Sequence, residues 1–280
     1  MIVASRPVSA CVVCYNNETT LGETIRSIQS QTVGVDDLLV VDDGSTDGSA
    51  AVAAGLGARV ISHPTNLGRG AARARAMREA RHDLVLCVDA TGTIDAEFVS
   101  RILPWFEEAH VAAVCSRIDD PRPRGLVRRW RARHLFQTGA QVSVARKASL
   151  ITGGSVLRRA AILGVGNFDA SLRYAEDADA GRRLLAAGHD VVFDPRVCMT
   201  STTDNSLAQV LERYSRWSAA SDGSPSWHGY LRQIAYSIKV MARQDLSAGD
   251  PAAAAISLLT PHYHAWKTLR RRTTRTVGSL

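Results

Sequence analysis

Residues 38–48 read Leu-Leu-Val-Val-Asp-Asp-Gly-Ser-Thr-Asp-Gly, a short apolar run that stops at two adjacent carboxylates and a glycine-rich turn. An apolar run bounded by turn residues is typical of a buried strand. Similar β-rich runs occur near 8–14, 58–62, 83–88 and 111–115, and helical patterns lie between the earlier ones. This alternation predicts an α/β fold with a mostly parallel central sheet flanked by helices.

The composition is that of a globular chain. Of 280 residues, 45% are hydrophobic and 22% are charged, which excludes disordered and collagen-like proteins. Because no apolar run approaches the roughly 18 residues of a spanning helix, we expect no transmembrane or signal segment. The odd count of five cysteines argues against a disulfide framework and predicts a reducing, cytoplasmic compartment. Cys11 and Cys14 lie inside an apolar run without a second pair, so we interpret them as core residues.

The net charge of +7 is carried almost entirely by arginine, since only three of the 34 basic residues are lysines. Arginine favours flat, bidentate partners such as phosphate, although scattered arginines can equally reflect genome composition. Nucleic-acid binding is an alternative interpretation of the charge. We do not expect it, because the arginines form clusters without a docking motif.

Between residues 116 and 142 the apolar residues follow neither a helix nor a strand period. The stretch 122–133 is strongly basic and predicts a mobile loop or lid that includes Trp130 and Arg131. Regular structure resumes near Thr152, and beyond 205 the pattern is helical. We therefore predict a domain over 1–204, with a first half (1–116) and a second half (117–204), and a helical extension over 205–280 with a basic tail.

Acidic residues follow two predicted strands. Asp42 and Asp43 end the strand near 38–42, and Asp89 ends the strand near 83–88. The carboxyl ends of strands in an open α/β sheet form the ligand crevice, where carboxylates can accept hydrogen bonds from a nucleoside or a sugar. The alternative interpretation is turn and capping chemistry, which serves well for Asp47.

Arg69 and Arg73 lie four residues apart near the start of a predicted helix, a combination that favours a phosphate group. For Arg75, Arg78 and Arg81 we favour an exposed basic face. Neither a G-x-G-x-x-G turn after the first strand nor a Walker phosphate loop is present, which argues against nicotinamide-dependent and P-loop enzymes.

Glu176 and Asp177 open another predicted helix. A helix N-terminus lowers the pKa of a carboxylate, so this interpretation keeps Asp177 ionised and able to take a proton from a hydroxyl nucleophile. Ordinary N-capping is the alternative.

The ordered series of these features resembles family 2 glycosyltransferases over about residues 7–220. The resemblance rests on VSACVVCYN (8–16), VVDDGSTDG (40–48), NLG (66–68) with Ala72 and Arg73, Asp89-Ala90, GG (153–154) with LRR (157–159), GNFD (166–169), and Glu176-Asp177 with Arg183-Leu184 and Gly188. It implies a Rossmann-like glycosyltransferase A-type fold, a nucleotide-diphospho-sugar donor, a hydroxyl acceptor, and inverting transfer by direct displacement. It also implies that the domain over 1–204 is catalytic, with a nucleotide-binding half (1–116) and an acceptor and catalytic half (117–204), and that the lid over 122–133 covers donor or acceptor.

The resemblance also implies residue roles. Asp177 is the general base, with Glu176 beside it, and donor binding falls to Tyr15, Asn16, Asp42, Asp43, Arg69, Arg73, Asp89 and Ala90. Gly153 and Gly154 join Trp130 and Arg131 as acceptor or lid residues.

Two departures concern the metal. The family usually has Asp-x-Asp, whose second acid holds a divalent ion, where this chain has Thr91. A metal-binding His is common after the late strand, where residues 196–201 read RVCMTS. Two alternatives therefore remain. Either a Mg²⁺ or Mn²⁺ ion is held by Asp89 with help from Asp95, or metal dependence is weakened and arginines supply part of the positive charge that neutralises the leaving diphosphate.

Together these features predict an inverting glycosyltransferase in the cytoplasm. Reversible peripheral attachment to the inner face of a membrane, through residues 122–133 or 267–275, is left open. The alternative function is that of a catalytically degenerate homologue that binds a nucleotide-sugar or a partner protein without turnover.

Overall fold

The structure is a computed structural model that describes residues 6–222 and 226–277, with side chains described for 6–216 and 226–268. The chain divides into two compact units. Unit 1 consists of Met1–Asp119 and Gln141–Thr203, and unit 2 consists of Asp120–Ala140 and Asp204–Leu280. Each unit is described by itself below.

Unit 1 contains all of the strands among the described residues. Its elements in chain order are β1 (Val8–Cys14), α1 (Glu18–Gln29), β2 (Asp37–Asp42), α2 (Ser49–Gly55), β3 (Arg59–Ser62), α3 (Arg69–Glu79), β4 (Leu84–Asp89), β5 (Gly92–Ile94), α4 (Phe98–Ile102), the 3-10 helix η1 (Leu103–Glu107), β6 (Val111–Asp119), β7 (Ser155–Arg158), α6 (Arg159–Gly164), α7 (Glu176–Ala186) and β8 (Asp190–Ser201).

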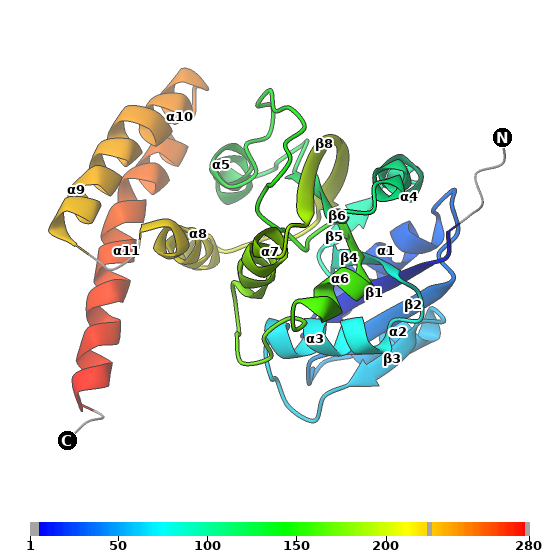
Figure 1. The fold of residues 1–280 in the computed structure, drawn as a ribbon. Helices are drawn as coiled ribbons and strands as arrows, with labels where there is room; N and C mark the ends of the chain where they lie inside the picture. The colour runs from blue at the N-terminus through cyan, green and yellow to red at the C-terminus, as the bar shows by residue number, and fades with distance from the viewer. Residues whose placement is uncertain (1–5, 223–225, 278–280) are drawn as a thin grey trace. The chain divides into compact units, whose positions relative to one another are not determined.

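The strands form one sheet in the order β3-β2-β1-β4-β7-β6-β8-β5, with helices on both of its faces (Figure 1). Strands β1 to β4 pair in parallel, as do β6 and β8, whereas β7 is antiparallel to both of its neighbours and β5 is antiparallel to β8. The predicted α/β class with a mostly parallel sheet is confirmed.

Two hydrophobic clusters cover the sheet. Alternate residues of β1 enter different clusters, since Val12 belongs to one and Cys11 to the other, as the two-residue period of a strand requires. Helix α1 contributes Leu21, Ile25 and Ile28 to the first cluster. All five cysteines are free, and four of them are buried, which agrees with their interpretation as core residues.

The strand register brings the predicted acids to one edge of the sheet. Cys14 at the end of β1 pairs with Asp42 of β2, and the preceding Val13 pairs with Asp89 of β4. Asp42 and Asp89 therefore flank the end of β1. This edge positions the candidate site.

Unit 2 is helical in its described part. Its elements are α5 (Leu126–His134), α8 (Leu207–Asp222), α9 (Trp227–Tyr236), the π-helix η2 (Ser237–Ala242), α10 (Arg243–Ser247) and α11 (Pro251–Val277).

The prediction of a mobile loop or lid over 122–133 is wrong. Most of this stretch lies in α5, where Trp130 and Arg131 are fully buried. The indole N–H of Trp130 donates to Ser257 Oγ at 2.8 Å, and Arg131 donates to Asp120 at 3.0 Å. Because buried carboxylates neutralise arginines of α5, an arginine-rich sequence here forms an internal helix.

The boundary between the units also differs from the one we predicted at residue 204. Residues 120–140, which we placed in the catalytic half, belong to unit 2, because α5 packs on elements that follow residue 204. None of the helices in the described part of the chain combines the length and the apolar composition needed to span a bilayer. Of the predicted basic tail, the arginine side chains at 270–272 and 275 lie outside those the structure describes.

Candidate active site

Asp42 lies at the C-terminal end of β2, beside the turn that follows β1. Asp42 is buried, and its Oδ1 accepts a hydrogen bond from the N–H of Ser45 at 3.1 Å. The N–H of Asn16 donates to Ser45 Oγ at 3.0 Å, and the Tyr15 side chain is exposed. Gly44 has φ +76°, and a Cβ there would lie 2.5 Å from the backbone of Thr65, so only glycine fits this turn. The structure thus brings Tyr15, Asn16 and Asp42 together at one edge.

Asp43 is an anchor for the loop that precedes α3. Its Oδ1 accepts from the N–H of Leu67 at 3.0 Å and lies 2.8 Å from Nδ1 of His63, and its Oδ2 accepts from the N–H of Gly68 at 2.8 Å. Both oxygens therefore have partners within the protein. His63 is a residue that we did not predict. It directly follows the strand predicted over 58–62, so the same strand-end argument could have found it.

Arg73 joins three elements of the site. It is buried on α3, and its Nε donates to Glu176 Oε1 of α7 at 2.9 Å, while Nη2 donates to Asp89 Oδ1 of β4 at 3.1 Å. Arg69, one turn earlier, is half exposed, and its Nε lies 3.8 Å from the same Glu176 oxygen. We define Arg73, Asp89 and Glu176 as the Arg73 cluster.

The structure changes the interpretation of Arg73. Burial lowers the pKa of its guanidinium, but the carboxylates of Asp89 and Glu176 outweigh burial and hold the pKa above its ordinary value. The charge of Arg73 is neutralised inside the protein, whereas we expected it to bind a phosphate group of the donor. Arg69 is the arginine of the pair that a ligand can approach.

Asp177 follows Glu176 in the first turn of α7, as predicted. Burial raises the pKa of Asp177 above its ordinary value of 3.8, while Arg73 acts in the opposite direction and Glu176 adds to the rise. The predicted direction is therefore wrong: the cost of burying the charge exceeds the effect of the helix N-terminus. A raised pKa makes Asp177 a stronger base than a solvated aspartate.

The end of β4 packs tightly against the start of β7. A Cβ on Gly153 would lie 2.9 Å from Oδ2 of Asp89, so the glycine allows the backbone to approach this carboxylate. The N–H of Gly154 donates to the carbonyl of Cys87 at 3.0 Å. Ala90 is buried, and its carbonyl accepts from Thr20 Oγ1 at 2.8 Å. Gly153, Gly154 and Ala90 thus shape the surroundings of Asp89.

The residues around Asp89 do not fit a divalent ion held by the protein alone. One oxygen of Asp89 accepts a hydrogen bond from Arg73. The nearby residues are Thr91 and Thr202, and the N–H of Thr202 donates to the carbonyl of Thr91 at 2.9 Å. Asp95 pairs with Arg101. In the described residues, no three His, Cys, Asp or Glu side chains gather as a metal site. Neutral hydroxyls are weak substitutes for the carboxylates that Mg²⁺ prefers.

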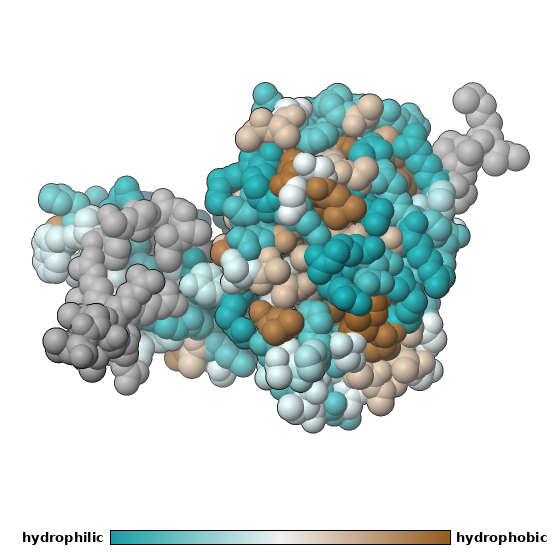
Figure 2. Space-filling view, turned by 60° about the horizontal axis from the view of Figure 1, so that its bottom comes forward, coloured by the Kyte–Doolittle hydropathy of each residue, from teal (hydrophilic) through white to brown (hydrophobic). Residues whose placement is uncertain are grey.

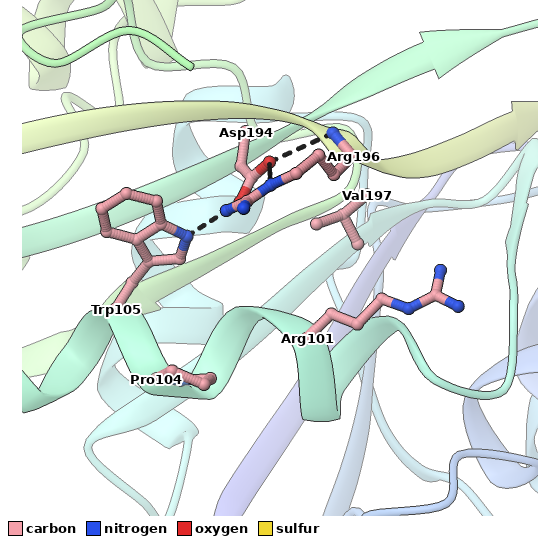
Figure 3. Close-up of a pocket in the computed structure, with 6 residues that line it drawn as sticks. All are labelled: Arg101, Pro104, Trp105, Asp194, Arg196 and Val197. Atoms are coloured by element: carbon pink, nitrogen blue, oxygen red, sulfur yellow. Dashed lines mark hydrogen bonds and ion pairs between the residues drawn. The ribbon is translucent and has the colours of Figure 1, made fainter. Parts of the chain in front are cut away.

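A pocket of about 660 Å³ lies elsewhere on unit 1 and contains none of the predicted site residues. It is lined by α4, η1 and β8. The indole N–H of Trp105 and the guanidinium of Arg196 both point at Asp194, while Arg101 extends separately from α4 (Figure 3). Since Asp194 already pairs with these groups, the strand-end edge remains the better candidate for chemistry.

A family comparison decides what kind of protein this edge belongs to. The profile of glycosyl transferase family 2 matches residues 9–165, which is more than half of the chain and extends from the second residue of β1 to the end of α6. The chain belongs to glycosyl transferase family 2. The match includes Asp42, Asp43, Arg73 and Asp89, and it ends before Glu176 and Asp177.

Solved structures confirm the glycosyltransferase A-type fold. The mannosyltransferase PcManGT from Pyrobaculum calidifontis, solved with GDP-Man and Mn²⁺, matches 95% of this chain and 88% of its own with a TM-score of 0.64 at 18% identity. S. aureus TarS 1-349, solved with UDP-GlcNAc, matches 94% of this chain and 88% of its own with a TM-score of 0.56 at 18% identity. At these identities the likeness shows the fold alone.

Among proteins of named function, the pre-mycofactocin glycosyltransferase of Mycobacterium tuberculosis is 29% identical over 202 residues. The match covers 68% of this chain and 41% of that protein. The chain thus spans about two fifths of the length of this relative.

Proposed function

We propose that unit 1 transfers a sugar from a nucleotide-diphospho-sugar to a hydroxyl acceptor with inversion at the anomeric carbon. One observation carries this proposal: Asp177, a partly buried carboxylate with a raised pKa, lies beside the Arg73 cluster, whose Asp89 ends a strand at the same edge as Asp42. Family membership supports the reaction class.

In the proposed reaction, Asp177 takes the proton of the acceptor hydroxyl while the hydroxyl oxygen attacks the anomeric carbon. The bond from that carbon to the diphosphate oxygen breaks, and the nucleoside diphosphate leaves. Ionised Asp177 suits this role because a base with a raised pKa removes a hydroxyl proton more readily than an ordinary aspartate does. Tyr15, Asn16 and Asp42 receive the nucleoside, and Arg69 faces the phosphates.

Glu176 and Arg73 orient the carboxylate of Asp89. Glu176 holds the guanidinium of Arg73, and Arg73 in turn holds Oδ1 of Asp89. Gly153 closes the other side of this carboxylate. Asp89 is thereby held in one orientation, in which it can accept hydrogen bonds from the hydroxyls of the donor sugar.

A binding protein without turnover is the second candidate, because the chain lacks the second acid of the usual metal motif at Thr91. A panel of UDP-, GDP- and dTDP-sugars separates the two functions. A donor that binds the native state raises the melting temperature. Release of nucleoside diphosphate with an acceptor present, and an inverted anomeric configuration by NMR, then support the enzyme, whereas binding without product supports the second candidate.

Asp42→Ala tests the nucleoside site. We expect weaker donor binding by about 1–3 kcal/mol, the usual cost of leaving a hydrogen-bonding partner unsatisfied. Titration calorimetry with the best donor of the panel measures it. Asp42→Asn keeps an acceptor for the Ser45 N–H and is the control for local structure. If donor affinity in Asp42→Ala equals that of the unmodified chain, Asp42 is not part of the site.

Exhaustive chelation tests the role of metal. We expect activity to fall only in part, because the residues at Asp89 do not form a protein-held ion site and Arg69 faces the same edge. In an Arg69→Gln variant the activity left after chelation should drop further, since the leaving diphosphate then lacks the neighbouring cation. Complete loss of activity on chelation, with full recovery on adding Mn²⁺, would contradict this expectation.

A further inference from the structure

The outer face of α11 is apolar over about its first four turns. Residues 251–266 include no Lys, Arg, Asp or Glu. The inner side of this stretch is buried, with Ala253, Ile256 and Ser257 among its residues. The opposite side is exposed and presents Ala252, Ala255, Leu258, Leu259, His262 and Trp266. A surface helix normally places charged or polar residues on its outer face, whereas the outer face of this stretch is uncharged and His262 is its polar member.

The neighbouring helix α9 continues this pattern. Trp227 is 70% exposed, and Leu231 and the η2 residue Ile238 are also exposed, at spacings that place all three on one side of the helix. The hydroxyl of Tyr230 on α9 lies 2.8 Å from Nδ1 of His262 on α11, which joins the two helices.

We call Trp227, Leu231, Ile238, Leu258, Leu259 and Trp266 the apolar set. Figure 2 shows one face of unit 1, on which hydrophobic residues occur in separate groups among hydrophilic ones.

The charges of unit 2 are strongly one-sided. Its sequence contains 16 basic and 6 acidic residues, a net charge of +10, whereas unit 1 contains 18 and 21, a net charge of −3. Between residues 226 and 277 the two acids are Asp245 and Asp250. Both are buried and paired with arginines of α5. The exposed surface of these helices therefore combines the apolar set with basic side chains such as Lys239 and Arg243, and it presents no acidic one.

We propose that unit 2 docks on the surface of an anionic phospholipid bilayer, with the apolar set inserted at the level of the head groups. Exposed tryptophan and leucine side chains beside lysine and arginine are typical of helices that lie in the membrane interface. Basic residues close to an anionic surface each add to the affinity, and acidic residues would oppose it. This inference is independent of the chemistry proposed for unit 1.

The charge also argues against other occupants. A second copy would bring a net charge of +10 against +10, which repels at short range. A nucleic-acid backbone matches the charge but gives no apolar environment to Leu231, Ile238, Leu258 or Leu259. An anionic bilayer matches both the charge and the apolar side chains.

Co-flotation of the full chain with vesicles tests this proposal. We expect binding to vesicles of phosphatidylcholine mixed with phosphatidylglycerol, and much weaker binding to phosphatidylcholine alone or at high salt. The variant Leu231→Gln, Leu259→Gln, Trp266→Gln keeps the charge and should lose at least about tenfold in apparent affinity. Val142→Gln with Val144→Gln, two exposed apolar residues of unit 1, is the matched control and should bind like the unmodified chain.

A second pair of variants tests the charge. Lys239→Gln with Arg243→Gln should weaken binding to the anionic vesicles by roughly tenfold or more at low salt. Arg78→Gln with Arg182→Gln, which removes two exposed arginines of unit 1, should have little effect. Circular dichroism and thermal melting check that each variant folds.

Four outcomes would overturn the proposal. In the first, the unmodified chain fails to float with anionic vesicles. In the second, the apolar variant floats as well as the unmodified chain while folded. In the third, the chain sediments as a dimer that the apolar variant converts to monomer without any vesicle binding, and in the fourth the chain binds nucleic acid in preference to vesicles.

Discussion

Replacing Asp177 with Asn should lower kcat by about 10²–10⁴-fold, the usual contribution of a general base. The change keeps the volume of the side chain and an oxygen for the N–H of Ala178, which now donates to Asp177 Oδ1 at 2.8 Å. Donor affinity should therefore stay nearly unchanged. Steady-state kinetics and donor titration on the same preparation measure both quantities. A large loss of donor affinity with unchanged turnover per bound donor would contradict the base assignment.

The pH dependence provides an independent check on Asp177. Since burial raises the pKa of this carboxyl above 3.8, kcat/KM should fall with decreasing pH through a value higher than that, and the variant should lack this limb. The raised pKa also means that the ionised group lowers stability above the unfolded pKa. Asp177→Asn should therefore be at least as stable as the unmodified chain at neutral pH.

A matched control lies two residues further along the same helix. Asp179 pairs with Arg182 and Arg183 and contacts neither Arg73 nor Asp89 in the ion pairs of the described residues. Asp179→Asn should change kcat by no more than about twofold, as expected for a substitution in a partly exposed ion pair. If kcat falls as far in Asp179→Asn as in Asp177→Asn, any loss of a carboxylate from this helix lowers activity, and the assignment of Asp177 as the base is not supported.

Replacing Arg73 with Leu should destabilise unit 1 by about 3–5 kcal/mol, because the buried carboxylate of Glu176 then loses its hydrogen-bonded cation. Only the half-exposed Arg69, whose Nε lies 3.8 Å away, remains close to it. The side chains of Arg73 and Glu176 are 5% and 1% exposed, so solvent screens the pair little. Urea unfolding followed by circular dichroism measures this change. Donor affinity should fall as well, since Asp89 loses the partner that orients it.

Arg75 on the same helix is the control for Arg73. Its side chain is 44% exposed and pairs with Glu79 one turn away. Arg75→Leu should cost no more than about 0.5 kcal/mol, the usual value of such an exposed pair. The double variant Arg73→Leu, Glu176→Leu removes both buried charges and should recover part of the lost stability. If the Arg73 and Arg75 variants have the same free energy of unfolding, the Arg73 cluster does not stabilise unit 1.

The sequence by itself determined the sheet and the edge at which the site lies. Apolar runs of strand length that end in Asp42 and Asp89 predicted buried parallel strands, and the register confirms that both acids flank the end of β1. This prediction succeeds because the period of a strand is local and the carboxyl ends of parallel strands meet at one edge. The ordered motifs likewise identified family 2, which the profile match confirms.

Only the tertiary structure decided which charges are buried and which partners they have. Arg73 meets Glu176 across 103 residues of sequence, and α5 meets the buried Asp250 across 121. No local pattern encodes such distant pairs, so the sequence predicted a mobile lid for the basic stretch 122–133 and a phosphate contact for Arg73. The direction of the Asp177 pKa was decided in the same way. Helix position is visible in the sequence and lowers the pKa, but burial by distant segments raises it, and burial is the larger effect.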